Sequence, residues 1–251
     1  RLCLGEALAR IAPGDLDLIG QAGKAFIDFC RPNGISALAL RALKLAGQEA
    51  CMTPRARELL RCDAIRSAGR NIGLLADLAE LAAAFGKAGL APVALKGPAL
   101  IGRIYDDPAL RPITDLDLLV DRAEPGGIRD SLVDLGYTQT AAYANLYCRG
   151  ATVIDLHEDV AGSARISGRA GAIDLPTCGL LRLSVPLDRY ATLRRLAPLD
   201  EILVLSYHLV KHGFGRLIWL VDLARCLDAL GDTHGPGRLA IRAQEAGMAP
   251  L

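Results

Sequence analysis

The chain has 251 residues, of which 51% are hydrophobic and 4% aromatic, and its 29 Lys and Arg against 28 Asp and Glu leave a formal net charge of +1. This length allows one large domain or two small ones with ample core, and a composition rich in Leu and Ala favours helices. The balanced charge does not favour long nucleic acid as a partner.

Two further features concern the compartment. No apolar run reaches the roughly 18 residues of a membrane span, so we expect no membrane partner. The seven cysteines are scattered and none forms a C-x-x-C pair, which is typical of reduced thiols. Together they predict a cytoplasmic protein.

Residues 1–88 are expected to be an N-terminal helical region. The turn signal Pro32-Asn33-Gly34 separates two short helices, after a first short element before residue 22. Thr53-Pro54 is a favourable helix start, and the apolar periodicity predicts one helix from there to Phe85.

Five arginines decorate this long helix: Arg55, Arg57, Arg61, Arg66 and Arg70. The interpretation we favour is a solvated helix face. The alternative is that one or two of them reach the phosphates of a ligand.

Residues 89–160 differ from the preceding helical region because strand-like and helix-like segments alternate, which predicts a small mixed β-sheet. Strands are expected at residues 93–95, 115–120, 137–140, 145–148 and 152–156, with helices at residues 98–105 and 125–135. Residues 161–197 are rich in glycine and are expected to be a loop-rich connection, with short strands near residues 181–185. Helices are predicted again at residues 199–210, 216–230 and 238–246, in a C-terminal helical region 198–251. The fold class expected is therefore α+β.

Asp115 and Asp117 lie two apart in a predicted strand, so both carboxylates face the same side, with α-carbons roughly 6–7 Å apart. Two like charges so placed repel, and a cation between them relieves that repulsion. Mg²⁺ suits such a site because it takes carboxylate oxygens together with substrate phosphates. Asp155 is another carboxylate in an apolar strand and would complete a cluster of three if its strand lies beside Asp117; otherwise it would pair with an arginine such as Arg149.

Lys96-Gly97-Pro98 connects the first strand to a helix. A glycine allows close approach of a ligand, a helix start offers free N–H groups, and a lysine adds a positive charge, which suits phosphate. The alternative is a plain turn with a lysine in solvent. Arg111 precedes the two carboxylates and either binds a triphosphate or braces its loop.

Three histidines are candidates for substrate contact. His157 faces the same side of its strand as Asp155 and either touches substrate or is structural. His208 and His212 lie four apart on a helix, a spacing that suits a metal pair, but no Glu or Cys completes a zinc site. Contact with substrate or phosphate is preferred, and simple surface placement is the alternative.

Taken together, these residues resemble a known group. Leu95-Lys96-Gly97, Arg111-Pro112, the Asp115-Leu-Asp117 run and Val153-Ile-Asp155-Leu-His157 are similar to the uncharacterised nucleotidyltransferase family of the DNA polymerase beta-like superfamily. The helical segment from Glu201 to Leu230 is similar to the C-terminal part of that family. Lys-Gly-Pro stands here where the superfamily usually has Gly-Ser, a departure that also occurs in this family.

The resemblance implies transfer of a nucleoside monophosphate from an NTP to an acceptor hydroxyl or phosphate, with two Mg²⁺ ions. Asp115 and Asp117 would then bind both metals, Asp155 would hold the catalytic one, and Lys96 and Gly97 would hold the β- and γ-phosphates. The acceptor would be a small molecule, a peptide or a protein. Two other hypotheses remain: a non-catalytic nucleotide-binding module with this fold, and a structural helical protein in which the three aspartates do not converge.

Overall fold

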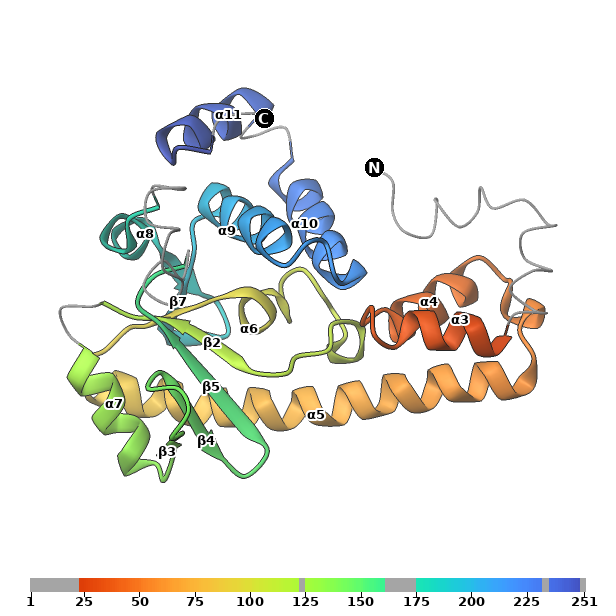
Figure 1. Ribbon diagram of the computed structural model, residues 1–251, viewed down its shortest axis with the longest axis horizontal. Coiled ribbons are helices and arrows are strands. Elements are labelled where there is room, and N and C mark those ends of the chain that lie inside the picture. The colour runs from red at the N-terminus through yellow and green to blue at the C-terminus, as the bar shows by residue number, and fades with distance from the viewer. Residues whose placement is uncertain (1–22, 122–124, 161–174, 232–234, 249–251) are drawn as a thin grey trace.

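The computed structural model describes residues 23–121, 125–160, 175–231 and 235–248. The short element expected before residue 22 lies outside these residues. Figure 1 shows a small sheet between a long helix on one face and a layer of shorter helices on the other. The α+β class is confirmed, with a mixed seven-stranded sheet.

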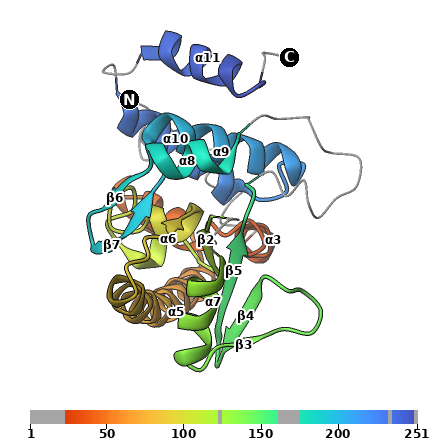
Figure 2. The same ribbon diagram turned by 90° about the vertical axis from the view of Figure 1, so that its left-hand side faces the viewer.

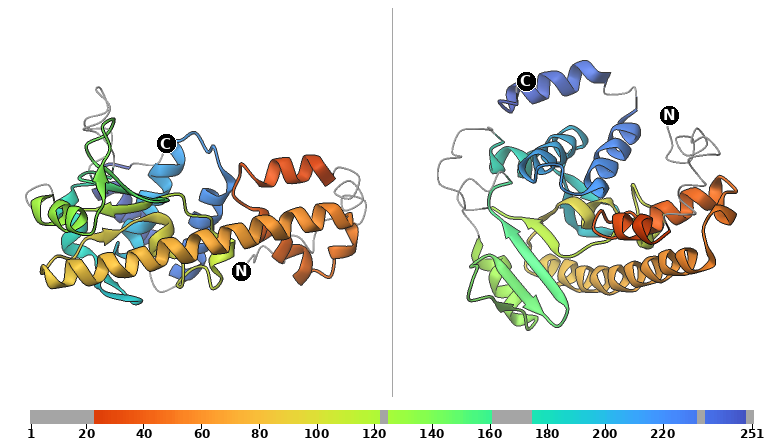
Figure 3. Two further views of the ribbon diagram at one scale, coloured as in Figure 1. Left: turned by 90° about the horizontal axis from the view of Figure 1, so that it is seen from below. Right: turned by 45° about the vertical axis from the view of Figure 1, so that its right-hand side comes forward.

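Helix α5 (Pro54–Lys87) has 34 residues, which corresponds to about 50 Å, and it runs under most of the molecule (Figures 1 and 3). It begins as expected, because the Thr53 hydroxyl accepts a hydrogen bond from the amide of Ala56 and Pro54 occupies the first turn. Its first half packs against α3 (Gly23–Cys30) and α4 (Ser36–Leu45) through a cluster that includes Ile27, Leu43 and Leu60. The expected N-terminal helices are therefore present over the described residues.

The sheet has the strand order β3-β4-β5-β2-β1-β7-β6. Strand β2 lies between β5, to which it is parallel, and β1, to which it is antiparallel. The strands are β1 (Val93–Ala94), β2 (Leu116–Leu119), β3 (Thr138–Gln139), β4 (Leu146–Arg149), β5 (Thr152–His157), β6 (Val185–Leu187) and β7 (Tyr190–Arg195).

Alternation along the central strands separates two faces of the sheet. Leu116, Leu118 and Ile154 pack into the core formed with the second half of α5 and with α7 (Pro125–Asp134). Leu119 packs on the opposite face, toward α8 (Thr177–Leu183), α9 (Pro198–Lys211) and α11 (Gly235–Glu245). Figure 2 shows α8 and α9 on this side, away from α5. Because successive side chains alternate, Asp117 shares the α9 face with Leu119.

A fourth cluster joins the N-terminal and C-terminal helices beside the sheet. It includes Leu38 of α4, Leu110 of the 3₁₀ helix η2 (Pro108–Leu110) and Ile218 of α10 (Leu217–Leu230). Helix α6 (Lys96–Leu100) also contributes Leu100. The loop between α6 and β2 is therefore held from both ends of the chain.

Two sequence predictions are corrected here. The helix expected at residues 98–105 ends at Leu100, because Gly102 takes a positive φ of 86° and turns the chain into a bridge between Ile101 and Tyr105. The segment expected to be loop-rich contains α8 and the β6–β7 hairpin from residue 177 onward, and residues 181–183 are helical.

Strand β7 was missed because it is a poorly alternating strand. Leu193 is fully buried in it, whereas Arg194 and Arg195 follow directly. Its place is fixed by pairing with β1 and by hydrogen bonds from Tyr190 and Thr192 to carbonyls of α5. These are tertiary contacts that a local pattern does not contain.

Among the described residues, every helix is too short or too polar to cross a bilayer. The six described cysteines are free thiols.

Candidate active site

Three ligand groups converge on the α9 face of the two central strands. Asp117 of β2 and Asp155 of β5 are register partners, and His157 follows Asp155 on the same face. One side-chain ligand atom from each residue lies within 4.8 Å of the other two. The convergence of Asp117 with Asp155 argues against the hypothesis of a purely structural helical protein.

Asp117 is the centre of the cluster. Its Oδ1 accepts a hydrogen bond from Lys96 Nζ at 2.8 Å and lies 2.7 Å from His157 Nε2. A second, longer contact of 3.4 Å joins His157 Nε2 to Asp155. Burial raises the cost of ionising Asp117, but the positive charge of Lys96 and the bond from His157 outweigh it and hold the pKa of Asp117 below its usual range.

Asp115 lies one residue before β2, not inside the strand as expected. Its carboxylate accepts a hydrogen bond from the Thr114 hydroxyl at 2.8 Å. Burial, and after it the neighbouring charge of Asp117, raises the pKa of Asp115. An acidic group with this environment gains from a nearby cation.

Lys96 and Gly97 lie just after β1, where the backbone of Lys96 is strained and the space around Gly97 is small. Lys96 has a φ of 53°, which is rare for a residue with a side chain, and such strain is often found at functional sites. A side chain at Gly97 would place its Cβ 3.0 Å from Ile113 Cγ1 and 3.1 Å from Arg111 Nη1. Because α6 has only five residues, any affinity for phosphate here depends on the Lys96 charge more than on a helix dipole.

Arg111 is buried and forms a forked ion pair with Asp222 of α10. Its Nη2 and Nε donate to Asp222 Oδ2 at 2.7 and 3.0 Å, and the Tyr105 hydroxyl donates to Asp222 Oδ1 at 2.6 Å. Arg111 Nη1 also donates to the carbonyl of Pro112. The side chain therefore braces its loop, one of the two roles expected, while it also borders the cavity next to Asp115.

His208 and His212 lie against the ring of Trp219, with ring centroids 4.7 and 5.4 Å from it. Burial, reinforced by the charge of Lys96, lowers the pKa of His208 to about 3, so its imidazole is neutral at physiological pH. Burial and Lys211 also lower the pKa of His212.

Two neighbouring cavities meet at the carboxylates. The smaller, of about 120 Å³, is bordered by Gly97, Arg111, Thr114, Arg216 and Trp219. The larger, of about 270 Å³, is bordered by Asp155, His157, Tyr207, Lys211 and His212. Lys96, Asp115, Asp117 and His208 border both. All nine residues singled out from the sequence thus lie around this pair of cavities.

The cluster suits a divalent cation. Carboxylate oxygens are the ligands that Mg²⁺ prefers, and imidazole nitrogen is a ligand for transition metals. Asp117 and Asp155 supply the oxygens, and Asp115 borders the same cavities. His157 was expected to touch substrate; the structure places it among the groups that are able to hold a metal.

Sequence reasoning did not assign a role to Asp222 or Arg216. Asp222 carries the signal that singled out Asp155, a lone carboxylate in an otherwise apolar segment, Leu217–Leu230. Arg216 stood out only as part of the segment similar to the C-terminal part of the family, because an arginine before a helix is unremarkable without knowledge of what lies opposite.

Comparison with known proteins identifies a family to which the chain is similar. No curated protein and no solved structure matches the chain. The model of a family described as "Uncharacterised nucleotidyltransferase" matches residues 22–251, nearly the whole chain, which confirms the resemblance drawn from the motifs. The chain belongs to this uncharacterised nucleotidyltransferase family.

Proposed function

We propose that the protein is an Mg²⁺-dependent nucleotidyltransferase that transfers a nucleoside monophosphate from an NTP to an acceptor hydroxyl or phosphate. The observation that carries the proposal is the register pairing of Asp117 with Asp155, which brings their ligand atoms and that of His157 within 4.8 Å in a chain of this family. A small molecule, a peptide or a protein is the acceptor class proposed, and the compartment proposed is the cytoplasm.

Asp115, Asp117 and Asp155 would hold two Mg²⁺ ions. When bound, such ions neutralise charge on the phosphates and stabilise the attacking and leaving oxygens of an in-line displacement. The chain's own contribution is to hold Asp117 and Asp155 side by side on two paired strands, where strand pairing restricts their movement, with Asp115 directly before β2.

Lys96, Gly97 and Arg111 would bind the phosphates of the donor NTP. They border the smaller cavity together with Arg216. Arg111 is held by Asp222, so its guanidinium keeps a fixed position, while the long stem of Lys96 allows its ammonium to follow a phosphate. The absence of a side chain at Gly97 lets a phosphate approach the backbone.

The acceptor would lie in the larger cavity, where Asp155 and His157 meet the histidines of α9. Asp155 would accept a hydrogen bond from the attacking hydroxyl. His208 is neutral, so it is able both to donate and to accept a hydrogen bond with the acceptor. His157 and His212 complete the substrate contacts proposed for this cavity.

A non-catalytic nucleotide-binding module is the second candidate. It needs the smaller cavity but makes no use of Asp155. The two candidates therefore differ in what loss of a carboxylate does: an enzyme loses transfer, while a binding module keeps its nucleotide affinity and never shows transfer.

The test incubates the protein with α-labelled NTPs, Mg²⁺ and a panel of candidate acceptors, and measures both label transfer and pyrophosphate release. We expect Asp117→Asn and Asp155→Asn to lose at least about 100-fold in rate, in line with loss of an electrostatic contact to the transition state. Asp130→Asn, which changes an exposed carboxylate on α7, is the matched control and should remain active. If no NTP is consumed with any acceptor and Asp117→Asn binds NTP as well as the wild type, the enzyme assignment is wrong.

A further inference from the structure

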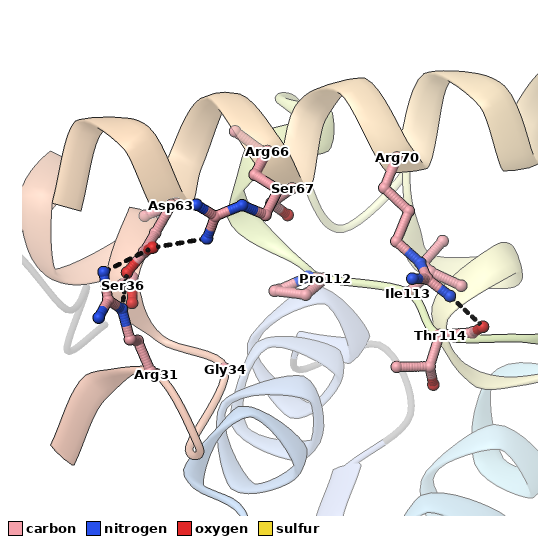
Figure 4. Close-up of a pocket in the computed structure, with 12 residues that line it drawn as sticks. Arg31, Gly34, Ser36, Asp63, Arg66, Ser67, Arg70, Pro112, Ile113 and Thr114 are labelled. Carbon is pink, nitrogen blue, oxygen red and sulfur yellow. Dashed lines mark hydrogen bonds and ion pairs between the residues drawn. The ribbon is translucent and has the colours of Figure 1, made fainter. Parts of the chain in front are cut away.

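A third cavity, of about 320 Å³, lies between α5 and the loop that leads to Asp115. Figure 4 shows Arg66 and Arg70 reaching into it from α5, Arg31 approaching from the opposite side, and Pro112 between them. The sequence had left open whether arginines of this helix only face solvent or also reach a ligand. Two of the five, Arg66 and Arg70, line the cavity.

Asp63 of α5 holds two of the three arginines, Arg31 and Arg66, in place. Asp63 accepts hydrogen bonds from Arg31 Nε and Nη2 at 2.8 and 3.2 Å, and from Arg66 Nη1 at 3.0 Å. Its own side chain is only 8% exposed, whereas those of Arg31 and Arg66 are 42% and 74% exposed. Asp63 thus orients two guanidinium groups that solvent reaches.

The cavity carries excess positive charge. Three arginines against one aspartate leave a formal excess of two positive charges among the lining residues. Arg66 and Arg70 are four apart on one helix face, so their like charges repel each other. A guanidinium has five N–H donors, more than the contacts to Asp63 and Thr114 use, so the cavity is suited to an anion with several oxygens, such as a phosphate.

This arginine cavity adjoins the candidate active site. Ile113 and Thr114 border both the arginine cavity and the smaller of the two active-site cavities. Arg70 Nη2 donates to the Thr114 carbonyl at 2.9 Å, and the Thr114 hydroxyl donates to Asp115 at 2.8 Å. Arg216 lies at the junction, because a Cβ on Gly34, which lines the arginine cavity, would come within 2.8 Å of its Nη2.

The two active-site cavities share Lys96, Asp115, Asp117 and His208 and differ in the residues that form their other walls. Asp155 and His157 border the larger cavity, and the arginines lie beyond Thr114 on the side of the smaller one. In an in-line phosphoryl transfer, the attacking and leaving oxygens are on opposite sides of the phosphorus. An acceptor placed beside Asp155 therefore directs the leaving group toward Thr114.

We propose that the arginine cavity formed by Arg31, Arg66 and Arg70 receives the pyrophosphate that leaves the reaction. This inference rests on the proposed function. In the reaction, a hydroxyl acceptor gives its proton to the Asp155 carboxylate as its oxygen forms a bond to the α-phosphorus. The bond from that phosphorus to the bridging oxygen breaks, and its electron pair leaves with pyrophosphate. Transfer of this product past Thr114 to the arginines would free the phosphate side of the active site for the next NTP.

The experiment titrates inorganic pyrophosphate and, separately, an Mg²⁺–NTP complex into the full chain by calorimetry. It compares wild type with Arg66→Gln/Arg70→Gln and with the matched control Arg55→Gln/Arg61→Gln, which removes two exposed charges from the same helix outside the cavity. We expect the Arg66/Arg70 variant to bind pyrophosphate about tenfold more weakly than both other proteins, since charge-assisted hydrogen bonds are lost. Its NTP affinity should change less than twofold.

Two results overturn the inference. Equal pyrophosphate affinity in the two double variants shows that the arginines hold no anion, and an equal loss of NTP and pyrophosphate affinity shows that they hold the donor itself. Thermal unfolding of each variant separates loss of binding from loss of fold. The outcome is independent of the transfer assay: weakened pyrophosphate binding without any transfer removes the proposed function alone, and transfer with unchanged pyrophosphate binding removes this inference alone.

Discussion

The ion pair between Arg111 and Asp222 gives the sharpest prediction for stability. Their side chains are 8% and 0% exposed, and three contacts of 2.7–3.2 Å join the guanidinium to the carboxylate. Asp222→Asn keeps the shape and leaves an oxygen for the Tyr105 hydroxyl, but it leaves Arg111 as an uncompensated buried charge. Breaking one partner of such a pair costs about 3–5 kcal/mol.

Urea unfolding followed by circular dichroism measures this change. We expect the midpoint to fall at constant slope, and the melting temperature to fall by about 6–20 °C for a chain of this size. Asp228→Asn, an exposed carboxylate on the same helix, is the control and should stay within about 0.5 kcal/mol of wild type.

A double variant tests the electrostatic reason. Arg111→Met/Asp222→Leu removes both charges, so it should be more stable than Asp222→Asn, because replacement of a buried pair by apolar side chains is often neutral. The reasoning is refuted if Asp222→Asn unfolds within about 1 kcal/mol of wild type, or if the double variant loses the full sum of the two single changes.

Three further predictions concern the site. Gly97→Ala should destabilise the protein by about 1–3 kcal/mol in urea unfolding, because its Cβ would come too close to Ile113 and to Arg111, which Asp222 holds in position. Gly73→Ala is the control. It has open space in the middle of α5 and should stabilise the protein by about 0.5–1 kcal/mol. Lys96→Met removes a cation that competes with a metal ion for Asp117. By calorimetry, this variant should bind Mg²⁺ more tightly than the wild type in the absence of nucleotide, and it should bind NTP more weakly. If the affinities for Mg²⁺ and for NTP both rise or both fall, the assignment of Lys96 to the donor phosphates is contradicted. His208, with its pKa lowered to about 3, should show ring NMR signals that do not titrate between about pH 5 and pH 8. Since the unfolded chain then binds the extra proton, stability should fall as pH drops below about 6.5, and His208→Gln should reduce this fall.

Much of the fold was predictable because its elements carry their own signals. Thr53-Pro54 and the apolar spacing of residues 59–82 define α5 without reference to the rest of the molecule. β2 and β5 are short runs in which apolar residues alternate with the carboxylates. The extension of the sheet by β7 was not predictable in the same way, because it is fixed by pairing with β1 and by hydrogen bonds to α5.

The features of the site also divide into those with a local sequence signal and those fixed only by tertiary contacts. Asp117 and Asp155 were found as carboxylates in apolar strands, where a lone charge needs a partner. Their exact register, and with it the distance between His157 and Asp117, depends on how β2 pairs with β5. The arginine cavity depends on three segments remote in sequence, so single arginines on α5 gave no basis for choosing Arg66 and Arg70.

The charges around Asp117 distinguish the two functional candidates better than the carboxylates themselves do. Lys96 already forms an ion pair with Asp117, and His157 lies within hydrogen-bond distance of it, so clustered carboxylates alone do not demand a metal. A module that only held a nucleotide would need the cations of the smaller cavity, Arg111 and Arg216. It would have no use for a carboxylate and an imidazole around a second cavity of about 270 Å³ that also borders Asp117. The proposed transfer reaction needs a phosphate-binding cavity and an acceptor cavity that share the metal-binding carboxylates, whereas nucleotide binding needs only the first of them.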